Sequence, residues 1–334
     1  MSYNLYEGDC LEVIPTLTED SVDLIILDPP YNIGKDSWDK FPSHEAYLDF
    51  IKKVLNECER VLKDNGSLYF WHNQFESVVD IFNLFRNDTD MVFKQLIVWN
   101  KRFNGASNKG FLDGFVVPDG LRNYQKMAEY LLYYTFQDET GLTTIKLDLN
   151  NFTSLRQYFK DFQKALGVTK KTIIEEIGQC ADHCFRWKSS QWDLPTFETY
   201  QELCKLPLKD YEFIRKDYES LRTEYEDLRR EYESLRYTYN NQKTHHSIWE
   251  YEIENTTNHQ TQKPIPLCEN IIKHSSNPND TILIPFAGSG SEMIASTNLN
   301  RNVIGIEKSP EYCNIIRERL NQGIQTTITE KALI

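Results

Sequence analysis

The first candidate catalytic motif in this chain is a tetrapeptide that follows a largely apolar segment. Residues 22–27 have the composition of a buried strand, and after them stand Asp28, Pro29, Pro30 and Tyr31. The Asp28 carboxylate and the Pro29 carbonyl could each accept one hydrogen of an exocyclic amine, turning the nitrogen lone pair towards a methyl donor. Prolines fix their own φ angles and so hold that carbonyl rigidly, and Tyr31 offers a flat face for an extruded base. A strand that merely ends in a Pro-Pro turn is the alternative, because short motifs also occur by chance.

A second signal lies near the other end of the chain. Residues 281–285 read as a buried strand, and a glycine-rich loop and a helical pattern from Ser291 follow. A strand, a glycine-rich turn and a helix N-terminus form the usual cradle for a nucleotide-like ligand in an open α/β sheet. The next strand, residues 302–306, ends in Glu307, where an acid can hold ribose hydroxyls. The loop consists of Phe286, Ala287, Gly288, Ser289 and Gly290.

Together these segments make the chain resemble the beta group of S-adenosyl-L-methionine-dependent DNA amino-methyltransferases. In that family the catalytic tetrapeptide, a target-recognition region and the cofactor loop follow one another in this order. The resemblance covers residues 1–137 and 247–320 and implies methyl transfer to N6 of an adenine flipped out of a specific DNA sequence. The implied fold class is α/β, a Rossmann-like open mixed sheet with helices on both faces, plus an all-α insertion.

The resemblance also implies the residues of a cofactor site, which the acid of the tetrapeptide would border. Asp9 would accept a hydrogen from the cofactor's adenine amino group, and a backbone amide near Cys10 would serve the ring. Thr261 and Lys263 would hold the methionine carboxylate. Two positions depart from the pattern. Gln260 stands where the family has proline, and Ile284 stands where the family usually has an aspartate that helps bind the methionine ammonium group. A nearby acid could take its place, but the sequence does not say which.

Composition indicates a soluble protein of a reducing compartment. Apolar residues make up 40% of the 334 residues, and no run approaches the ~20 apolar residues of a membrane span. The first residues lack a basic cluster and an apolar stretch, so no signal peptide is expected. Seven cysteines without paired spacing indicate reduced thiols, and Cys180, His183 and Cys184 lack the second spaced pair of a zinc site. We therefore expect a cytoplasmic protein of a bacterial or phage-like context, without a membrane partner or a metal.

Charge taken over the whole chain opposes nucleic-acid binding, because the net charge is −13. Basic residues nevertheless gather in residues 91–126 and 151–190, and the Gly/Asn-rich stretch 104–123 is too long for a simple hairpin. We expect double-stranded DNA to bind in these regions, although a solvated mixed surface is the alternative. The predicted contacts are Arg102, Lys109, Arg122, Lys170, Lys171, His183, Arg186, Lys188 and Gln191.

Helix and strand patterns divide the chain into three regions. Residues 1–150 and 241–334 form the expected catalytic core, in which strands are predicted over 5–7, 22–27, 67–71, 92–99, 130–136, 281–285 and 302–306 and helices over 10–17, 43–62, 75–86, 264–274 and 310–321. Residues 151–208 form a helical insertion, with helices over 155–166, 170–177, 181–188 and 197–206. This order resembles a phage-repressor helix-turn-helix domain, whose third helix enters the major groove. A four-helix insertion that only braces the fold is the alternative.

The remaining region, residues 209–240, has a heptad repeat and is predicted to form a helix. Arginines and acids occupy the e and g positions, which would pair across a parallel homodimer through residues 210–239. The alternative is a helix that folds back along its own chain, with its charges solvated. The apolar seam consists of Tyr211, Ile214, Tyr218, Leu221, Tyr225, Leu228, Tyr232, Leu235 and Tyr239.

Two other functions stay open at this point. The first is a methyltransferase that acts on cytosine N4 or on RNA, for which the tetrapeptide argues poorly. The second is a DNA-binding regulator with a decayed methyltransferase core, which Ile284 and the repressor-like insertion suggest.

Overall fold

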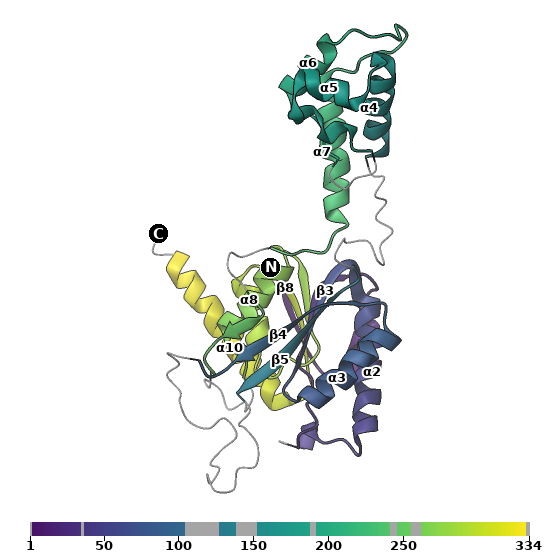
Figure 1. Cartoon of the computed structure of the whole chain (residues 1–334). Helices are drawn as coiled ribbons and strands as arrows, with labels where there is room; N and C mark the ends of the chain where they lie inside the picture. Colours follow the sequence, from purple (N-terminus) through teal and green to yellow (C-terminus); the bar gives the residue numbers. More distant parts are fainter. Residues whose placement is uncertain are drawn as a thin grey trace. The chain divides into compact units, whose positions relative to one another are not determined.

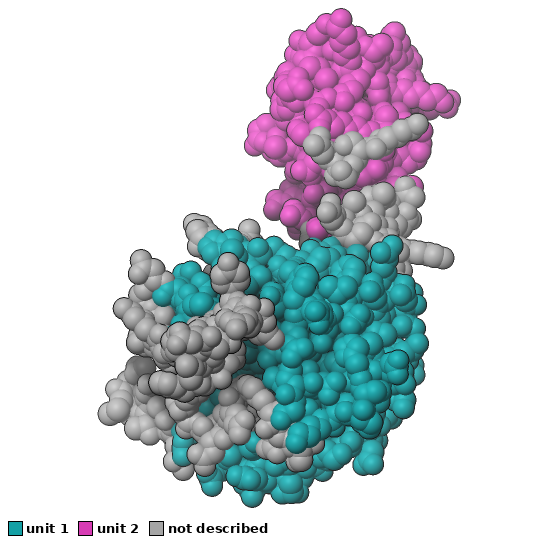
Figure 2. All heavy atoms as spheres, turned by 60° about the horizontal axis from the view of Figure 1, so that its bottom comes forward, with its two compact units in different colours: residues 1–145, 237–334 teal, residues 146–236 magenta. Residues whose placement is uncertain are grey.

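The computed structural model describes residues 2–34, 37–103, 127–137, 152–187, 192–240, 246–254 and 262–331. Contacts divide the chain into two compact units, coloured separately in Figure 2. The sheet unit comprises Met1–Ile145 and Tyr237–Ile334, and the helical unit comprises Lys146–Arg236. The heptad segment up to residue 236 thus shares a compact unit with the helical insertion.

The sheet unit contains an eight-stranded mixed sheet, in line with the predicted fold class. Its order is β1-β8-β7-β2-β3-β5-β4-β6. The first five strands in this order run parallel, β5 is antiparallel to β3 and β4, and β6 is parallel to β4. The three-residue strand β6 is too short to show a pattern in the sequence, and it was not predicted. The strands are β1 (Tyr3–Glu7), β2 (Val22–Leu27), β3 (Leu62–His72), β4 (Val92–Asn100), β5 (Ala128–Thr135), β6 (Ile248–Glu250), β7 (Thr281–Ile284) and β8 (Asn302–Glu307).

Helices cover both faces of this sheet (Figure 1). Successive strand residues point to opposite faces, so Ile25 and Leu27 of β2 join one apolar cluster while Leu24 and Ile26 join the other. All four are fully buried, which explains the apolar run from Leu24 to Leu27 in β2. The first cluster is covered by α1 (Cys10–Val13), α2 (His44–Val61) and α3 (Phe75–Asp88), and the second by α8 (Ile265–Ser275), α9 (Ser291–Asn298) and α10 (Pro310–Lys331).

The carboxyl ends of four parallel strands meet at one edge of the sheet. Strand β2 pairs with β7 in a register that places Ile25 opposite Leu283, so the segments after both strands emerge side by side. Strand β1 pairs with β8 up to Glu7 opposite Glu307. The tetrapeptide, the glycine-rich loop and the first residues after β1 and β8 are therefore neighbours, although they are far apart in the sequence.

The helical unit packs around aromatic and aliphatic side chains that its helices share. Its helices are α4 (Thr153–Leu166), α5 (Lys170–Ile177), α6 (Phe197–Lys205) and α7 (Tyr218–Ser234). Leu155, Phe159, Phe162, Ile173 and Leu203 are fully buried in its core. Among the described helices of both units, none is long and apolar enough to cross a bilayer.

The predicted third helix of the repressor-like domain, residues 181–188, is not formed. Two short 3-10 turns, η4 (Gln179–Ala181) and η5 (His183–Phe185), stand in its place. Arg186 leaves the helical region with φ −97° and ψ 65°. The Trp192 indole donates to the Cys184 carbonyl at 3.0 Å and occupies the acceptor that a continuing α-helix would use. The prediction of a recognition helix here was therefore wrong.

The heptad segment is helical only from Tyr218, not from its predicted start at residue 209. Leu221 is fully buried and Leu228 packs against the same core of the helical unit. Tyr211 and Ile214, which precede the helix, are 91% and 84% exposed. The central heptads therefore pack against their own helical unit, which is the alternative to a homodimer given above.

Candidate active site

A cavity of about 680 Å³ lies at the carboxyl edge of β1, β2, β7 and β8. The tetrapeptide after β2 and the loop after β7 both line it, so the two chemical signals of the sequence meet in one place. Gly290 is not part of the wall, and Thr261 is outside the described residues. The predicted site residues in the wall are Asp9, Cys10, Asp28, Pro29, Pro30, Tyr31, Lys263, Phe286, Ala287, Gly288, Ser289 and Glu307.

The glycine-rich loop has the backbone conformation that its sequence requires. Gly288 and Gly290 have φ angles of 51° and 80°, in the left-handed region that other residues rarely adopt. A Cβ atom on Gly290 would lie 2.9 Å from Cγ1 of Ile316 in α10. Gly290 is thus needed for close packing of the loop on that helix, while Gly288 faces the cavity.

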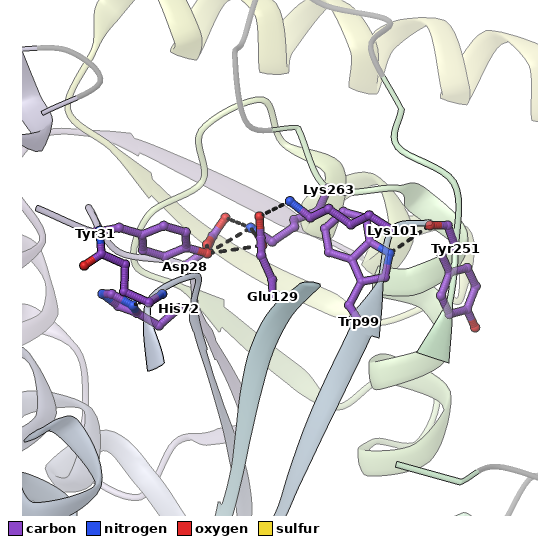
Figure 3. Close-up of polar contacts among 9 residues, drawn as sticks. Asp28, Tyr31, His72, Trp99, Lys101, Glu129, Tyr251 and Lys263 are labelled. Carbon is purple, nitrogen blue, oxygen red and sulfur yellow. Dashed lines mark hydrogen bonds and ion pairs between the residues drawn. The ribbon is translucent and has the colours of Figure 1, made fainter. Parts of the chain in front are cut away.

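Both carboxylate oxygens of Asp28 already accept a hydrogen bond (Figure 3). The Tyr31 hydroxyl donates to Oδ1 at 2.5 Å, and the Lys263 ammonium donates to Oδ2 at 2.6 Å. Each oxygen keeps a second lone pair for a ligand. Lys263 is only 2% exposed, and its predicted contact with a methionine carboxylate remains a prediction because its ammonium group here lies against Asp28.

Sequence reasoning missed Glu129 of β5, a second acid beside Lys263 that is 5% exposed. Its carboxylate lies 3.3 Å from the Lys263 ammonium and also pairs with Lys101, which follows β4. Burial alone would raise the pKa of Glu129, but Lys263 and Lys101 lower it to about 2. The available signal was that Glu129 is the one charged residue among residues 127–136, otherwise typical of a buried strand.

Tyr31 is packed inside the protein, where it holds Asp28 in position. Its ring is 7% exposed, and its centroid lies 4.7 Å from that of His72, whose pKa burial lowers to about 4. Asp39, also missed from the sequence, accepts from the amides of Asn32 at 2.7 Å and Ile33 at 3.1 Å and so fixes the turn after the tetrapeptide. Stacking of a base on Tyr31 remains a prediction.

Two predicted acids at the other end of the cavity already organise the backbone. Glu307 accepts from the amides of Gly288 and Ser309, both at 2.8 Å, and burial raises its pKa. Asp9 accepts from the Leu11 amide at 3.0 Å, which caps α1, and pairs with Lys308 at 3.0 Å. All four carboxylate oxygens therefore already accept at least one hydrogen bond, and each acid keeps lone pairs for a ligand.

The predicted DNA contacts are less evenly supported. Lys170 and Arg186 both form ion pairs with Asp182 inside the helical unit, so these two basic side chains have a structural role there. Lys171 is exposed and His183 lies on the surface. The Arg102 amide donates to the Asn100 side chain at 3.1 Å. Outside the described residues lie Lys109, Arg122, Lys188 and Gln191.

Known proteins resemble this chain over most of its length. The Type II methyltransferase M1.MboII of Moraxella bovis is 25% identical over 319 residues, which are 95% of this chain and 96% of that protein. The DNA adenine methyltransferase YhdJ of Escherichia coli (strain K12) is 25% identical over 341 residues, 99% of this chain and 86% of that protein. These two relatives each match across both units.

Solved structures share the fold. TTHA0409 of Thermus thermophilus, described as a candidate DNA modification methylase and solved with S-adenosyl-L-methionine, matches with a TM-score of 0.50 and 18% identity over 97% of this chain and 96% of that one. The cytosine-N4-specific PvuII DNA methyltransferase matches with a TM-score of 0.50 and 13% identity over 93% and 84%. A family model described as DNA methylase matches residues 22–318, and with the cavity that joins the tetrapeptide to the glycine-rich loop this places the chain in the DNA methylase family.

Proposed function

We propose that this protein transfers a methyl group from S-adenosyl-L-methionine to N6 of an adenine in double-stranded DNA. The observation that carries the proposal is the shared cavity, because Asp28 and Pro29 line it together with the glycine-rich loop and Glu307. The family assignment supports a DNA substrate, and the adenine version of the tetrapeptide supports N6 over cytosine N4.

The residues of the cavity fit the cofactor. S-adenosyl-L-methionine supplies an electrophilic methyl group when bound. Phe50 and Phe286, whose ring centroids are 6.1 Å apart, give the cavity apolar walls suited to a flat ring. Glu307 has lone pairs left for ribose hydroxyls, and Glu292 has a buried carboxylate oxygen without a partner among the described residues, which suits a positively charged donor.

The chain's own residues position and polarise the target amine. Asp28 would accept one amine hydrogen with a remaining lone pair, and the Pro29 carbonyl would accept the other, which favours a pyramidal nitrogen. The amine needs no prior deprotonation, because nitrogen loses its proton after the new carbon–nitrogen bond has formed. Lys263 and Tyr31 hold the Asp28 carboxylate in place, so catalysis is mainly orientation and electrostatic stabilisation.

A methylation assay tests this function. Purified protein is incubated with duplex DNA and methyl-labelled cofactor, and the product is digested to nucleosides and separated. N6-methyladenine is expected, and Asp28→Ala should lose transfer while it still binds the cofactor in calorimetry. N4-methylcytosine or a methylated RNA would replace the proposal with the first alternative. A wild-type protein that binds no cofactor would favour the regulator with a decayed core.

We further infer that the helical unit and residues 91–126 recognise the target sequence, without a repressor-type recognition helix. Exposed basic side chains such as that of Lys171 support a role of the helical unit in phosphate contact. A homodimer through residues 210–239 also stays a proposal, and the exposed seam residues that could contact a partner are Tyr211, Ile214, Leu235 and Tyr239. Sedimentation of the full chain at several concentrations would test it. We also propose a cytoplasmic location. The seven cysteines, all of them free thiols, support it because thiols stay reduced in that compartment.

A further inference from the structure

One buried acid of the cavity has a carboxylate oxygen with no hydrogen-bond donor among the residues that the structure describes. Glu292, in the first turn of α9, is 5% exposed and lines the cavity. Its Oε1 atom accepts no hydrogen bond from the residues that the structure describes. A buried carboxylate oxygen without a donor is costly, because it has lost its hydration and gained no hydrogen bond in return. Such an atom therefore indicates a group that the protein alone does not supply.

The two cations near Glu292, Lys263 and Arg319, bind other groups of the protein. The Lys263 ammonium group pairs with Asp28 and Glu129. Arg319 of α10 donates to the Ser289 carbonyl at 2.5 Å. Within the described residues neither cation forms an ion pair with Glu292. Burial and the negative charge of Asp28 raise the pKa of Glu292 to about 7, while Lys263 and a hydrogen bond with the Cys268 thiol of α8 oppose this rise.

We propose that Glu292 binds the α-ammonium group of the cofactor's methionine part, which the chain cannot bind through Ile284. This inference rests on the proposed function. The cofactor has two cationic groups, and the sulfonium carries no hydrogen to donate. An unpartnered acceptor oxygen needs a donor, and the ammonium group has three. Ile284, eight positions earlier, is 1% exposed and apolar, so the acid missing there is supplied from the first turn of α9.

Binding at Glu292 should be linked to proton release. Because the pKa of Glu292 is raised to about 7, part of the empty protein carries a proton on Glu292 near neutral pH. An ammonium group against the carboxylate favours its charged form. Ligand binding should then release protons near neutral pH, and affinity should fall as the pH drops below the raised pKa.

Calorimetry on the full chain with two ligands tests the inference. S-adenosylhomocysteine keeps the α-ammonium group and has no sulfonium, whereas 5′-methylthioadenosine keeps the nucleoside and lacks the amino-acid part. Glu292→Gln should weaken S-adenosylhomocysteine binding about ten-fold to a hundred-fold, the effect of a charged hydrogen bond, and leave methylthioadenosine within about two-fold. The matched control is Glu311→Gln, an exposed acid of α10, which should change neither affinity.

Proton release provides a second measurement that needs no variant. Titrations of the wild-type protein in buffers of different ionisation enthalpy should show proton release with S-adenosylhomocysteine and none with methylthioadenosine. Unchanged S-adenosylhomocysteine affinity in Glu292→Gln, equal weakening of both ligands, or the same proton release for both would each overturn the role of Glu292. Wild-type protein that binds neither ligand would instead overturn the proposed function, so the two failures are distinguishable.

Discussion

Glu129→Gln is the substitution that tests the buried charge cluster most directly. The change keeps the size of the side chain and one acceptor oxygen, and it removes a single negative charge. Residue 129 then no longer balances Lys101 and Lys263, and a net positive charge remains where four charged groups had been neutral together (Figure 3). We expect a less stable sheet unit.

The magnitude follows from the pKa of Glu129. A pKa of about 2 in place of 4.5 corresponds to about 3 kcal/mol of net interaction in favour of the charged carboxyl. Loss of one partner of a buried pair costs a similar amount, about 3–5 kcal/mol. Because the pKa is lowered in the folded protein, this stability is present above pH 4.5 and is lost as the pH falls towards 2. The free energy of unfolding of Glu129→Gln at pH 7 should therefore be lower by about 3 kcal/mol.

Urea unfolding followed by tryptophan fluorescence measures this difference. Trp71 and Trp99 lie 5.1 Å and 4.7 Å from the ammonium groups of Lys263 and Lys101, so the signal includes the cluster. Glu250→Gln, an exposed acid of β6, is the matched control and should change the free energy by less than about 0.5 kcal/mol. A loss below about 1 kcal/mol for Glu129→Gln, or a loss that does not shrink as the pH falls below 4.5, would refute the reasoning.

Three further outcomes follow from the packing. Leu221→Asp should unfold the helical unit and Leu235→Asp should not, as circular dichroism can show, because only Leu221 is fully buried; equal effects would contradict the folded-back helix. Gly290→Ala should lower the melting temperature, since its φ of 80° and the close approach to Ile316 leave no room for Cβ; an unchanged transition would argue against this packing. Replacing residues 146–236 with a short linker should preserve cofactor binding and abolish sequence selectivity, and an unchanged methylation pattern would exclude the helical unit as reader.

The sheet was predictable because its strands are marked locally. Residues 24–27 are apolar on both faces, and the structure has a strand over residues 22–27, as predicted. The glycines of the loop at residues 286–290 likewise mark a turn, and the positive φ angles of Gly288 and Gly290 follow from it. Parallel pairing then brings the ends of β2 and β7 together without further information.

The helical unit shows where local reasoning failed. Residues 181–188 have the spacing of a short helix, but a side chain from outside the window, Trp192, takes the Cys184 carbonyl. Gly178, with φ 108°, ends α5 as its glycine predicts, so the error concerns the residues after it. The apolar spacing of residues 181–188 cannot reveal a competing hydrogen bond from a side chain that lies outside this segment.

The polar half of the active site required the structure for a related reason. Asp28 follows β2, Lys263 precedes α8 and Glu129 is the second residue of β5, and their contacts span up to 235 positions. No sequence spacing predicts these contacts. An unpaired charge inside the protein costs more free energy than a buried ion pair, so each of the three side chains depends on the others. The same argument explains why Glu292 differs from this cluster. Glu129 forms ion pairs with two cations of the chain, whereas Glu292 forms none with Lys263 or Arg319 among the described residues, and its partner is therefore expected to come from the ligand.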